Sequence, residues 1–306
     1  MADARQRRAE RRQARRRLVL VGVAVVVIVL AGVVAVLTLS GGTTISTPGG
    51  PALGSGSGRR HSSGSGGDSR LVRNARPQPG WEPHTGPVPI LVYHALGEAP
   101  ASEEYPGLYV PEPEFEAEMA WLHQHGYEAV TLDQVERAWY HGGTLPAKPI
   151  VITFDNGYPA QVTFAPRVLS RYGWPAVLFE ITEEHLRPRE IRPVIALGWE
   201  VDSHSATHPD LTQLSGKELE YQVAASRRYL RRKFGIPSDN FCYPSSEYDA
   251  TTIAAVKEAG YVGAVTENPG YATRGEPYEL DRYEIVGGAG VEGLAADLAA
   301  GASAAG

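Results

Sequence analysis

Residues 149–158 read PIVITFDNGY. The first six are apolar or β-branched without interruption, which predicts a parallel strand buried on both faces. The run ends at Asp155 and Asn156, and a helix is expected over about 160–172. In α/β folds, polar residues just past the carboxyl ends of parallel strands form the active site. Asp155 and Asn156 therefore mark a candidate site, although a strand-end Asp can also simply cap the helix that follows it.

Shorter segments of the same two kinds alternate along the rest of the chain. Apolar runs predict strands, and apolar residues at helical spacing predict helices between them. The expected strands lie at 88–93, 130–132, 176–179, 240–243 and 262–266, and the expected helices at 113–125, 133–141, 215–234 and 250–259. Strands that alternate with helices imply parallel βαβ units, so we expect an α/β fold.

Two further strand ends carry side chains that can take part in catalysis. HSATHP stands at residues 204–209 and CYP at residues 242–244. Two histidines four residues apart can lie on one side of a helical turn and bind one metal ion, but the spacing alone also suits two surface or capping histidines. Together with the polar pair after the first strand, His204 and His208 fit a carboxylate or amide plus two imidazoles around one divalent ion.

At these positions the chain resembles the polysaccharide deacetylases, also called the NodB-homology family or carbohydrate esterase family 4. The matching segments are PILVYH at 89–94, TFDNGY at 153–158, GWEVDSHSATHPDL at 198–211 and FCYPSSEYD at 241–249. The similarity covers roughly residues 87–290, and the motifs occur in the order and spacing of the family. The resemblance implies a distorted parallel (β/α) barrel of fewer than eight units.

The resemblance also implies roles for individual residues. Asp155 corresponds to the catalytic base. Asn156, His204 and His208 correspond to the three metal ligands, with Asn156 where the family usually has Asp.

The third motif is implied to be an oxyanion and substrate-binding element. Tyr243 is expected to offer its backbone N–H to the oxyanion that develops on the substrate, and Pro244 lies beside it. Ser246 stands where the family commonly has Gly, and no Arg flanks the motif.

The sequence departs from the family pattern in one metal ligand and in the residue that serves as general acid. A neutral Asn156 removes one negative charge and should weaken metal binding, although TFDNGY resembles the muramyl-peptide deacetylase branch of the family. Many members use a late histidine as general acid, and no histidine follows His208. His94 is our candidate for that role, with a structural hydrogen bond that braces the first strand as its alternative. Arg282 is a candidate for the late Arg that orients the base, and a surface Arg is the alternative there.

Residues 18–39 form an uninterrupted apolar stretch with 19 aliphatic residues among 22. As a helix this length spans the ~30 Å hydrocarbon core of a bilayer, which predicts a transmembrane anchor. A cleaved signal peptide and a buried core helix are the alternatives. Eight Arg within residues 1–17 predict a single-pass protein of the cell membrane, with a cytoplasmic N-terminus and an extracytoplasmic C-terminal domain.

Composition divides the rest of the chain. Residues 40–86 are rich in Gly, Ser and Pro and predict a flexible linker. The predicted organisation is a cytoplasmic Arg-rich segment at 1–17, a transmembrane helix at 18–39, that linker, a deacetylase-like domain at 87–298 and a disordered tail at 299–306.

The net charge of −6 divides into +6 for residues 1–17 and −12 for the remainder. An acidic body argues against nucleic-acid binding, which needs clustered cations. The single cysteine, Cys242, excludes an internal disulfide and a multi-cysteine zinc cluster. We expect it to be a buried, inert thiol with no nearby cation.

The resemblance and the N-terminal segment together predict a membrane-anchored, metal-dependent hydrolase. Its substrate would be an acetylated polysaccharide or peptidoglycan of the cell envelope, from which it removes N-acetyl (or O-acetyl) groups. Imidazole ligands with few carboxylates suit one ion of zinc or another late first-row metal. A non-catalytic glycan-binding module on the same barrel and a structural anchoring protein are the alternatives, and the sequence does not allow a protein partner to be predicted.

Overall fold

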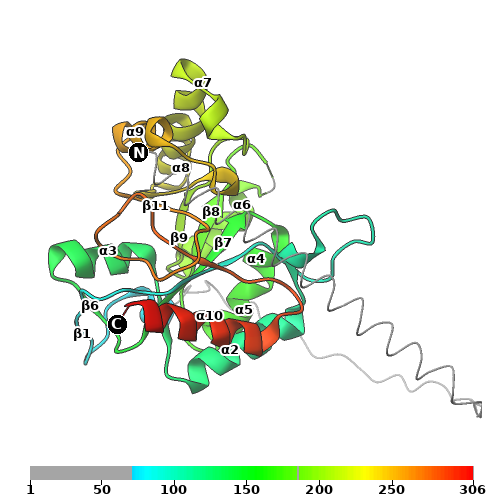
Figure 1. Ribbon diagram of the computed structural model, residues 1–306, viewed down its shortest axis with the longest axis vertical. Helices are drawn as coiled ribbons and strands as arrows, with labels where there is room; N and C mark the ends of the chain where they lie inside the picture. The colour runs from blue at the N-terminus through cyan, green and yellow to red at the C-terminus, as the bar shows by residue number, and fades with distance from the viewer. Residues whose placement is uncertain (1–70, 185, 306) are drawn as a thin grey trace, which may run out of the picture. The chain divides into compact units, whose positions relative to one another are not determined.

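Eight parallel strands form a curved sheet at the centre of the structure, a computed structural model that describes residues 71–184 and 186–305. They are β2 (Ile90–Tyr93), β5 (Glu128–Val130), β7 (Pro149–Asn156), β8 (Val177–Glu180), β9 (Glu200–Ser203), β10 (Asn240–Cys242), β11 (Gly263–Val265) and β12 (Tyr283–Glu284). Their order is β11–β10–β9–β8–β7–β2–β12, and β5 pairs with the start of β7. Because every pair is parallel, the carboxyl ends of these strands lie at one rim of the sheet. Figure 1 labels β7, β8, β9 and β11 among them.

One segment of the chain links the two edges of the sheet. Leu280 forms a parallel bridge with Val265 of β11, and Tyr283 of β12 pairs with Leu91 of β2. This closure confirms the predicted distorted parallel (β/α) barrel.

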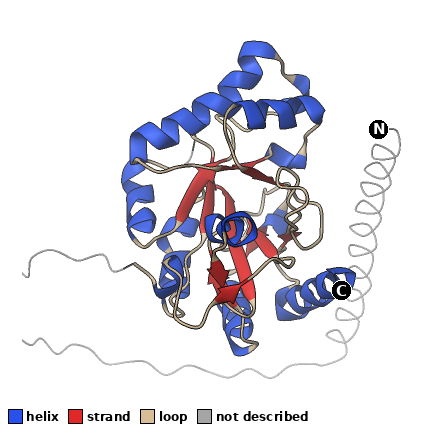
Figure 2. Cartoon of the chain, turned by 90° about the vertical axis from the view of Figure 1, so that its left-hand side faces the viewer, coloured by secondary structure: helices blue, strands red, loops and turns tan. Residues whose placement is uncertain are grey.

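Helices surround the sheet (Figure 2). They are α2 (Glu112–Gln124), α3 (Leu132–His141), α4 (Pro159–Thr163), α5 (Ala165–Ser170), α6 (Pro188–Ala196), α7 (Gly216–Glu220), α8 (Ser226–Phe234), α9 (Ala250–Glu258) and α10 (Gly290–Ala305). Short helical turns are η1 (Arg73–Ala75), η2 (Pro106–Leu108), η3 (Leu211–Gln213), η4 (Tyr221–Ala225) and η5 (Pro244–Ser246). Two small sheets pair β1 (Glu82–Pro83) with β6 (Thr144–Leu145) and β3 (Ala95–Leu96) with β4 (Tyr109–Val110).

Strand β7 is buried on both faces, as its sequence predicts. Ile152 and Phe154 pack in the apolar layer between sheet and helices, whereas Val151 belongs to the cluster inside the barrel. Complete burial of one such side chain stabilises the fold by about 1.5–3 kcal/mol. Because successive side chains of a strand point to opposite faces, Thr153 and Asp155 follow Val151 into the barrel.

Residues 71–86 belong to the folded unit, so the predicted linker boundary at residue 86 is wrong. Asn74 is fully buried, and its Nδ2 donates to the carbonyl oxygen of Ala129 at 3.1 Å. Trp139 Nε1 donates to the carbonyl oxygen of Gly86 at 2.9 Å, and β1 pairs with β6. Amino-acid composition does not predict these contacts, because they are made by one side-chain amide and by backbone groups and leave no apolar pattern in the sequence.

The C-terminus is helical where a disordered tail was predicted. Helix α10 continues through residues 299–305, and Leu298 and Gly301 on it are buried. Tyr271 donates its hydroxyl hydrogen to the carbonyl oxygen of Leu298 at 2.9 Å. Alanine has the highest intrinsic helix propensity, which explains why this small-residue segment is ordered once its face is covered.

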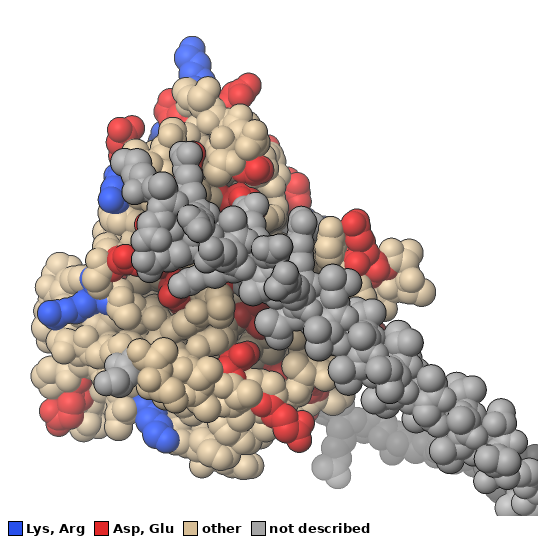
Figure 3. All heavy atoms as spheres, in the orientation of Figure 1, with Lys and Arg blue, Asp and Glu red and all other residues tan. Residues whose placement is uncertain are grey.

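The predicted transmembrane helix at 18–39, and the segments predicted at 1–17 and 40–70, lie outside the described residues. Within 71–184 and 186–305, no helix combines the length and the apolar character needed to cross a bilayer. Acidic side chains are spread over the face drawn in Figure 3, in keeping with the net charge of −12 after residue 17.

Candidate active site and metal centre

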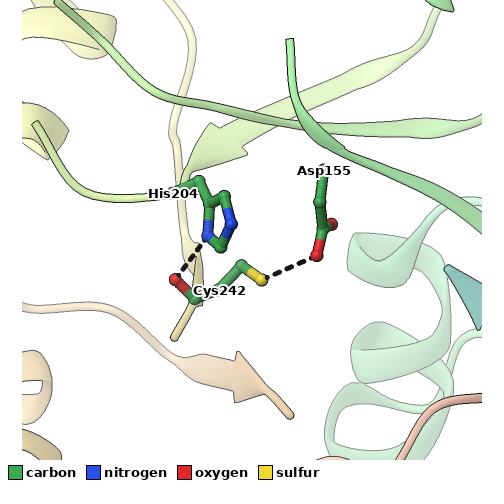
Figure 4. A group of neighbouring side chains, drawn as sticks. All are labelled: Asp155, His204 and Cys242. Carbon is green, nitrogen blue, oxygen red and sulfur yellow. Dashed lines mark hydrogen bonds between the residues drawn. The ribbon is translucent and has the colours of Figure 1, made fainter. Parts of the chain in front are cut away.

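Four strand ends bring polar side chains to one rim of the barrel. Asp155 lies at the end of β7, His94 follows β2, His204 follows β9 and Cys242 ends β10. Potential ligand atoms of Asp155, His204 and Cys242 all lie within 4.8 Å of one another, as do those of His94, Asp155 and Glu267. Figure 4 shows the first of these groups. Asp155 is thus the residue that the two groups share.

Asp155 is fully buried and forms a two-point ion pair with Arg282, which is also fully buried. Arg282 Nη1 donates to Asp155 Oδ1 at 2.8 Å, and Nη2 donates to Oδ2 at 2.7 Å. Burial by itself would raise the pKa of the Asp155 carboxyl, but the charge and hydrogen bonds of Arg282 hold that pKa below its ordinary value. Asp155 is therefore a carboxylate at neutral pH.

Every N–H of the Arg282 guanidinium has an acceptor. Besides Asp155, Nε donates to the carbonyl oxygen of Thr266 at 2.8 Å, Nη1 to Thr153 Oγ1 at 3.0 Å and Nη2 to Cys242 Sγ at 3.1 Å. A guanidinium has five donors, and all five are used here. Arg282 is therefore a fixed interior support for the carboxylate and not a surface residue.

Cys242 is buried as predicted, but the expectation that no cation lies near it is wrong. The guanidinium of Arg282 contacts its sulfur, because the last strand brings that residue into the barrel. Burial nevertheless raises the pKa of the thiol well above its ordinary value, against the opposing effect of Arg282. The side chain is therefore a protonated thiol.

His204 and His208 face each other through the same ring nitrogen, with Nε2 to Nε2 at 3.1 Å. Nδ1 of His204 lies 2.9 Å from the carbonyl oxygen of Cys242. Because a carbonyl can only accept, we assign the proton to Nδ1, which leaves the lone pair on Nε2. Burial lowers the pKa of His204 to about 3 and also lowers that of His208. Both rings are neutral at pH 7, the form in which imidazole binds a metal.

The loop that carries the two histidines has an unusual backbone. Ser205 and His208 have φ values of 69° and 61°, a region that few residues other than glycine adopt. Ser205 Oγ accepts a hydrogen bond from the His208 N–H at 2.9 Å. Gln222 Oε1 accepts from the backbone N–H groups of the two residues between them, at 3.1 and 3.0 Å. Gln222 lies in the π-helical turn η4, a feature often found at functional sites.

Asn156 ends β7 with a φ of 79°. Its Nδ2 donates to the hydroxyl oxygen of Tyr158 at 3.3 Å, while its buried Oδ1 has no hydrogen-bond partner among the described residues. An unpaired buried amide oxygen is costly unless another group binds it. This oxygen is therefore suited to the ligand role that the resemblance implies.

The donor set fits a divalent metal ion. Zinc–nitrogen bonds of about 2.0–2.1 Å place two tetrahedral ligand nitrogens about 3.4 Å apart, close to the separation of the two Nε2 atoms. Two neutral imidazoles and an amide oxygen suit zinc or another late first-row ion better than calcium or magnesium, which prefer several carboxylates. Asp155 is held by Arg282, which keeps an ionised carboxylate close to the His204 ring.

His94 lies beside the same carboxylate. Its Nε2 is 3.7 Å from Glu267 Oε1, and its buried Nδ1 has no hydrogen-bond partner within the described part of the chain. Burial lowers the pKa of His94, while Asp155 and Glu284 raise it. Gln161 Nε2 donates to the backbone carbonyl oxygens of both His94 and Asp155 at 2.7 Å. The strand end is therefore braced through the backbone, and the imidazole ring is not used for it.

The third motif differs from its prediction. The Tyr243 N–H, expected to bind an oxyanion, donates to the carbonyl oxygen of Val265 at 3.4 Å. The Tyr243 side chain is buried, and its hydroxyl donates to the carbonyl oxygen of Tyr278 at 3.0 Å, while Pro244 is buried at the start of η5. The pairing of β10 with β11 continues one residue past the strand and so engages this N–H.

Sequence patterns missed three polar residues at this rim, namely Gln161, Gln222 and Glu180. Glu180 ends β8, and burial raises the pKa of its carboxyl to about 9. It packs against Gly157, where a Cβ would clash with Glu180 Oε2 and where φ is +92°. Only Gln161 had a local signal: it lies three residues after Tyr158 and accepts from that backbone N–H at 2.9 Å, as a helix-capping Gln does.

Comparison with known proteins identifies relatives of this arrangement. The family model described as polysaccharide deacetylase matches residues 142–264. YxkH of Bacillus subtilis, whose name assigns it to the polysaccharide deacetylases, is 30% identical over 204 residues, covering 65% of this chain and 71% of the relative. The poly-β-1,6-N-acetyl-D-glucosamine N-deacetylase of Escherichia coli is 34% identical over 95 residues, which are 31% of this chain and 14% of that protein.

The fold is also similar to solved structures. A crystal structure of a polysaccharide deacetylase from Bacillus cereus superposes with a TM-score of 0.62 at 29% sequence identity, covering 69% of each chain. The matched part includes most of the residues that the structure describes.

Proposed function

The chain belongs to the polysaccharide deacetylase family, a family of hydrolases, and we propose that it removes N-acetyl (or O-acetyl) groups from a cell-envelope polysaccharide or peptidoglycan in a metal-dependent reaction. The observation that carries this proposal is the meeting of an ionised, buried carboxylate with two neutral imidazoles at one rim of the barrel. Asp155 is the base, and His204 and His208 are metal ligands. The E. coli relative, named for a polymer of N-acetylglucosamine, supports an N-acetylated sugar chain as substrate.

A divalent ion held by His204, His208 and Asn156 Oδ1 would polarise the acyl carbonyl and make a water acidic. Asp155 takes the proton of the attacking water, because Arg282 keeps it ionised. All of the donors of Arg282 are used within the protein, so none is left for the substrate. Its role is to fix the orientation of the Asp155 carboxylate.

The leaving amine or alcohol needs a proton, and we assign this transfer to His94. A ring nitrogen of His94 lies within 4.8 Å of a carboxylate oxygen of Asp155, and Nδ1 is not used by the fold among the described residues. The charges of Asp155 and Glu284 favour the imidazolium form of His94 and act against burial, which lowers its pKa, and Glu267 Oε1 lies 3.7 Å from Nε2.

A glycan-binding module that has lost turnover is the second candidate. The observation in its favour is Asn156, whose neutral oxygen binds a cation less strongly than the usual carboxylate. The absence of any histidine after His208 points the same way.

Acetate release separates the two candidates. Purified protein is incubated with acetylated chitooligosaccharide and with peptidoglycan fragments, after chelation and after addition of Zn²⁺, Co²⁺ or Ni²⁺. The hydrolase releases acetate only with metal, and Asp155→Asn abolishes release while metal stays bound. If the protein binds these glycans with metal present but releases no acetate, the glycan-binding candidate replaces the hydrolase.

We further propose that residues 18–39 anchor the protein in the cell membrane, with residues 1–17 cytoplasmic and the catalytic domain extracytoplasmic. The uninterrupted apolar run and the preceding Arg cluster support this orientation. A reporter fused after Gly306 should be active only in an extracytoplasmic assay and should sediment with membranes. Cytoplasmic activity, or a released protein that begins near Gly41, would contradict it.

A further inference from the structure

We propose that Cys242 is a positioning residue that fixes the base, Asp155, and one metal ligand, His204, in place relative to each other. This inference rests on the proposed function. Its thiol donates to Asp155 Oδ2 at 3.2 Å. Its backbone carbonyl accepts from His204 Nδ1 at 2.9 Å. Figure 4 shows the two contacts, one on each side of the same residue. Base and ligand come from different strands, and β10 supplies the residue that touches both.

The directions of the hydrogen bonds around the thiol follow from the chemistry of its neighbours. Arg282 Nη2 lies 3.1 Å from Cys242 Sγ and 2.7 Å from Asp155 Oδ2. A guanidinium has no acceptor, and an ionised carboxylate has no donor. The thiol must therefore accept from Arg282 and donate to Asp155. Every polar hydrogen of the three side chains then has one acceptor, although two of the Arg282 hydrogens go to Thr266 and Thr153 outside this group.

The thiol thus supplies the second donor to Asp155 Oδ2. Cys242 is 1% exposed and lies in the apolar cluster inside the barrel, so water cannot easily replace its hydrogen bond. Alanine at this position would leave Oδ2 with the Arg282 bond alone. A serine hydroxyl can both accept and donate, so it should retain most of the effect.

The backbone contact acts on the metal ligand. By accepting from Nδ1 of His204, the carbonyl of Cys242 selects the tautomer whose free Nε2 faces His208. A side-chain substitution at Cys242 keeps this carbonyl. Such variants therefore test the contact with Asp155 while leaving metal binding intact.

Infrared spectroscopy tests the thiol contact without any enzymatic assay. The chain has one cysteine, so its S–H stretching band is a unique reporter. In the parent protein, the hydrogen bond to the Asp155 carboxylate should place the S–H band at a lower frequency than that of a thiol without a hydrogen bond. In Asp155→Asn the acceptor is a neutral amide, a weaker partner, and the band should move to higher frequency. An unmoved band overturns the proposal, whether or not the protein releases acetate.

Kinetics test the positioning role. Cys242→Ala should lower kcat by about tenfold, with KM and zinc affinity within about twofold of the parent, and Cys242→Ser should recover most of the loss. Val265→Ala is the matched control: Val265 pairs with Cys242 in register, belongs to the same interior cluster and should keep kcat within about twofold. If Cys242→Ala loses no more kcat than this control, the proposal is wrong. A thiolate-to-metal charge-transfer band in the Co²⁺-loaded protein would also overturn it, because Cys242 would then be a ligand.

Discussion

Arg282 and Asp155 are 127 residues apart in sequence and form a bidentate ion pair in which neither side chain is exposed. The pair places a carboxylate inside the barrel and keeps it ionised there. Removal of one partner from such a buried pair typically costs about 3–5 kcal/mol, because the other charge is left uncompensated. The proposed base, Asp155, is thus coupled to the stability of the barrel.

Arg282→Lys should lower kcat by about tenfold to a hundredfold. Lysine keeps the positive charge but offers a point charge in place of a planar fork, so at least one charge-assisted hydrogen bond to Asp155 is lost. Steady-state kinetics with a saturating metal ion measure the effect, and zinc affinity is measured in parallel. Unchanged kcat in a folded Arg282→Lys protein would show that the bidentate geometry has no part in turnover.

His204→Ala and His208→Ala should each lower zinc affinity by at least about tenfold, and the double variant should bind no zinc at this rim. Calorimetric titration of the chelated protein measures this affinity. His141→Ala is the control, because His141 is an exposed histidine at the end of α3. Equal zinc uptake by the parent and the double variant would show that the two facing Nε2 atoms are not ligands.

Asn156→Asp should raise metal affinity by about an order of magnitude or more, since a negative charge replaces a dipole next to the cation. Aspartate, like asparagine, tolerates the positive φ at this position, so the backbone should not change. Activity at limiting metal should rise with affinity. A competition titration against a chelator measures the change, and lower affinity in the variant would exclude Asn156 as a ligand.

A second group of buried acids predicts how stability depends on pH. We call Asp133, Glu136, Glu200 and Asp202 the carboxyl cluster. Asn240 Nδ2 donates to Glu200 Oε1 at 3.1 Å, and the backbone N–H of Asp133 donates to Glu200 Oε2 at 2.9 Å. Burial raises the pKa of Glu136 to about 9 and that of Asp202 to about 7. The charge of Glu200, together with burial, raises the pKa of Asp133 to about 8.

These raised pKa values mean that the folded state binds more protons than the unfolded chain. The stability that the carboxyl cluster contributes is therefore fully present below the ordinary pKa values of 3.8 to 4.5 and is lost as pH rises through the folded values. One group changes the free energy of unfolding by at most about 1.4 kcal/mol per pH unit in that range. Urea unfolding from pH 5 to 9 should show this decline. Glu136→Gln should make it less steep, and equal slopes in parent and variant would contradict the assignment.

The alternation of strands and helices could be predicted from the sequence because it depends on local patterns. Side chains two residues apart share a strand face, and those three or four apart share a helix face. The pattern around β7 predicted its burial on both faces and located Asp155 and Asn156 at its end. The two histidines were found in the same way, since their spacing is local.

The tertiary structure alone decided which distant groups meet. Arg282 could equally have been a surface residue, Cys242 was expected to lie far from any cation, and the Tyr243 N–H was expected to be free. Each outcome depends on the closure of the sheet, which brings β10, β11 and the segment before β12 around the end of β7. Contacts across tens of residues have no local periodicity. Which buried polar groups become hydrogen-bond partners depends on the positions that they take when the sheet closes, and only the folded chain fixes those positions.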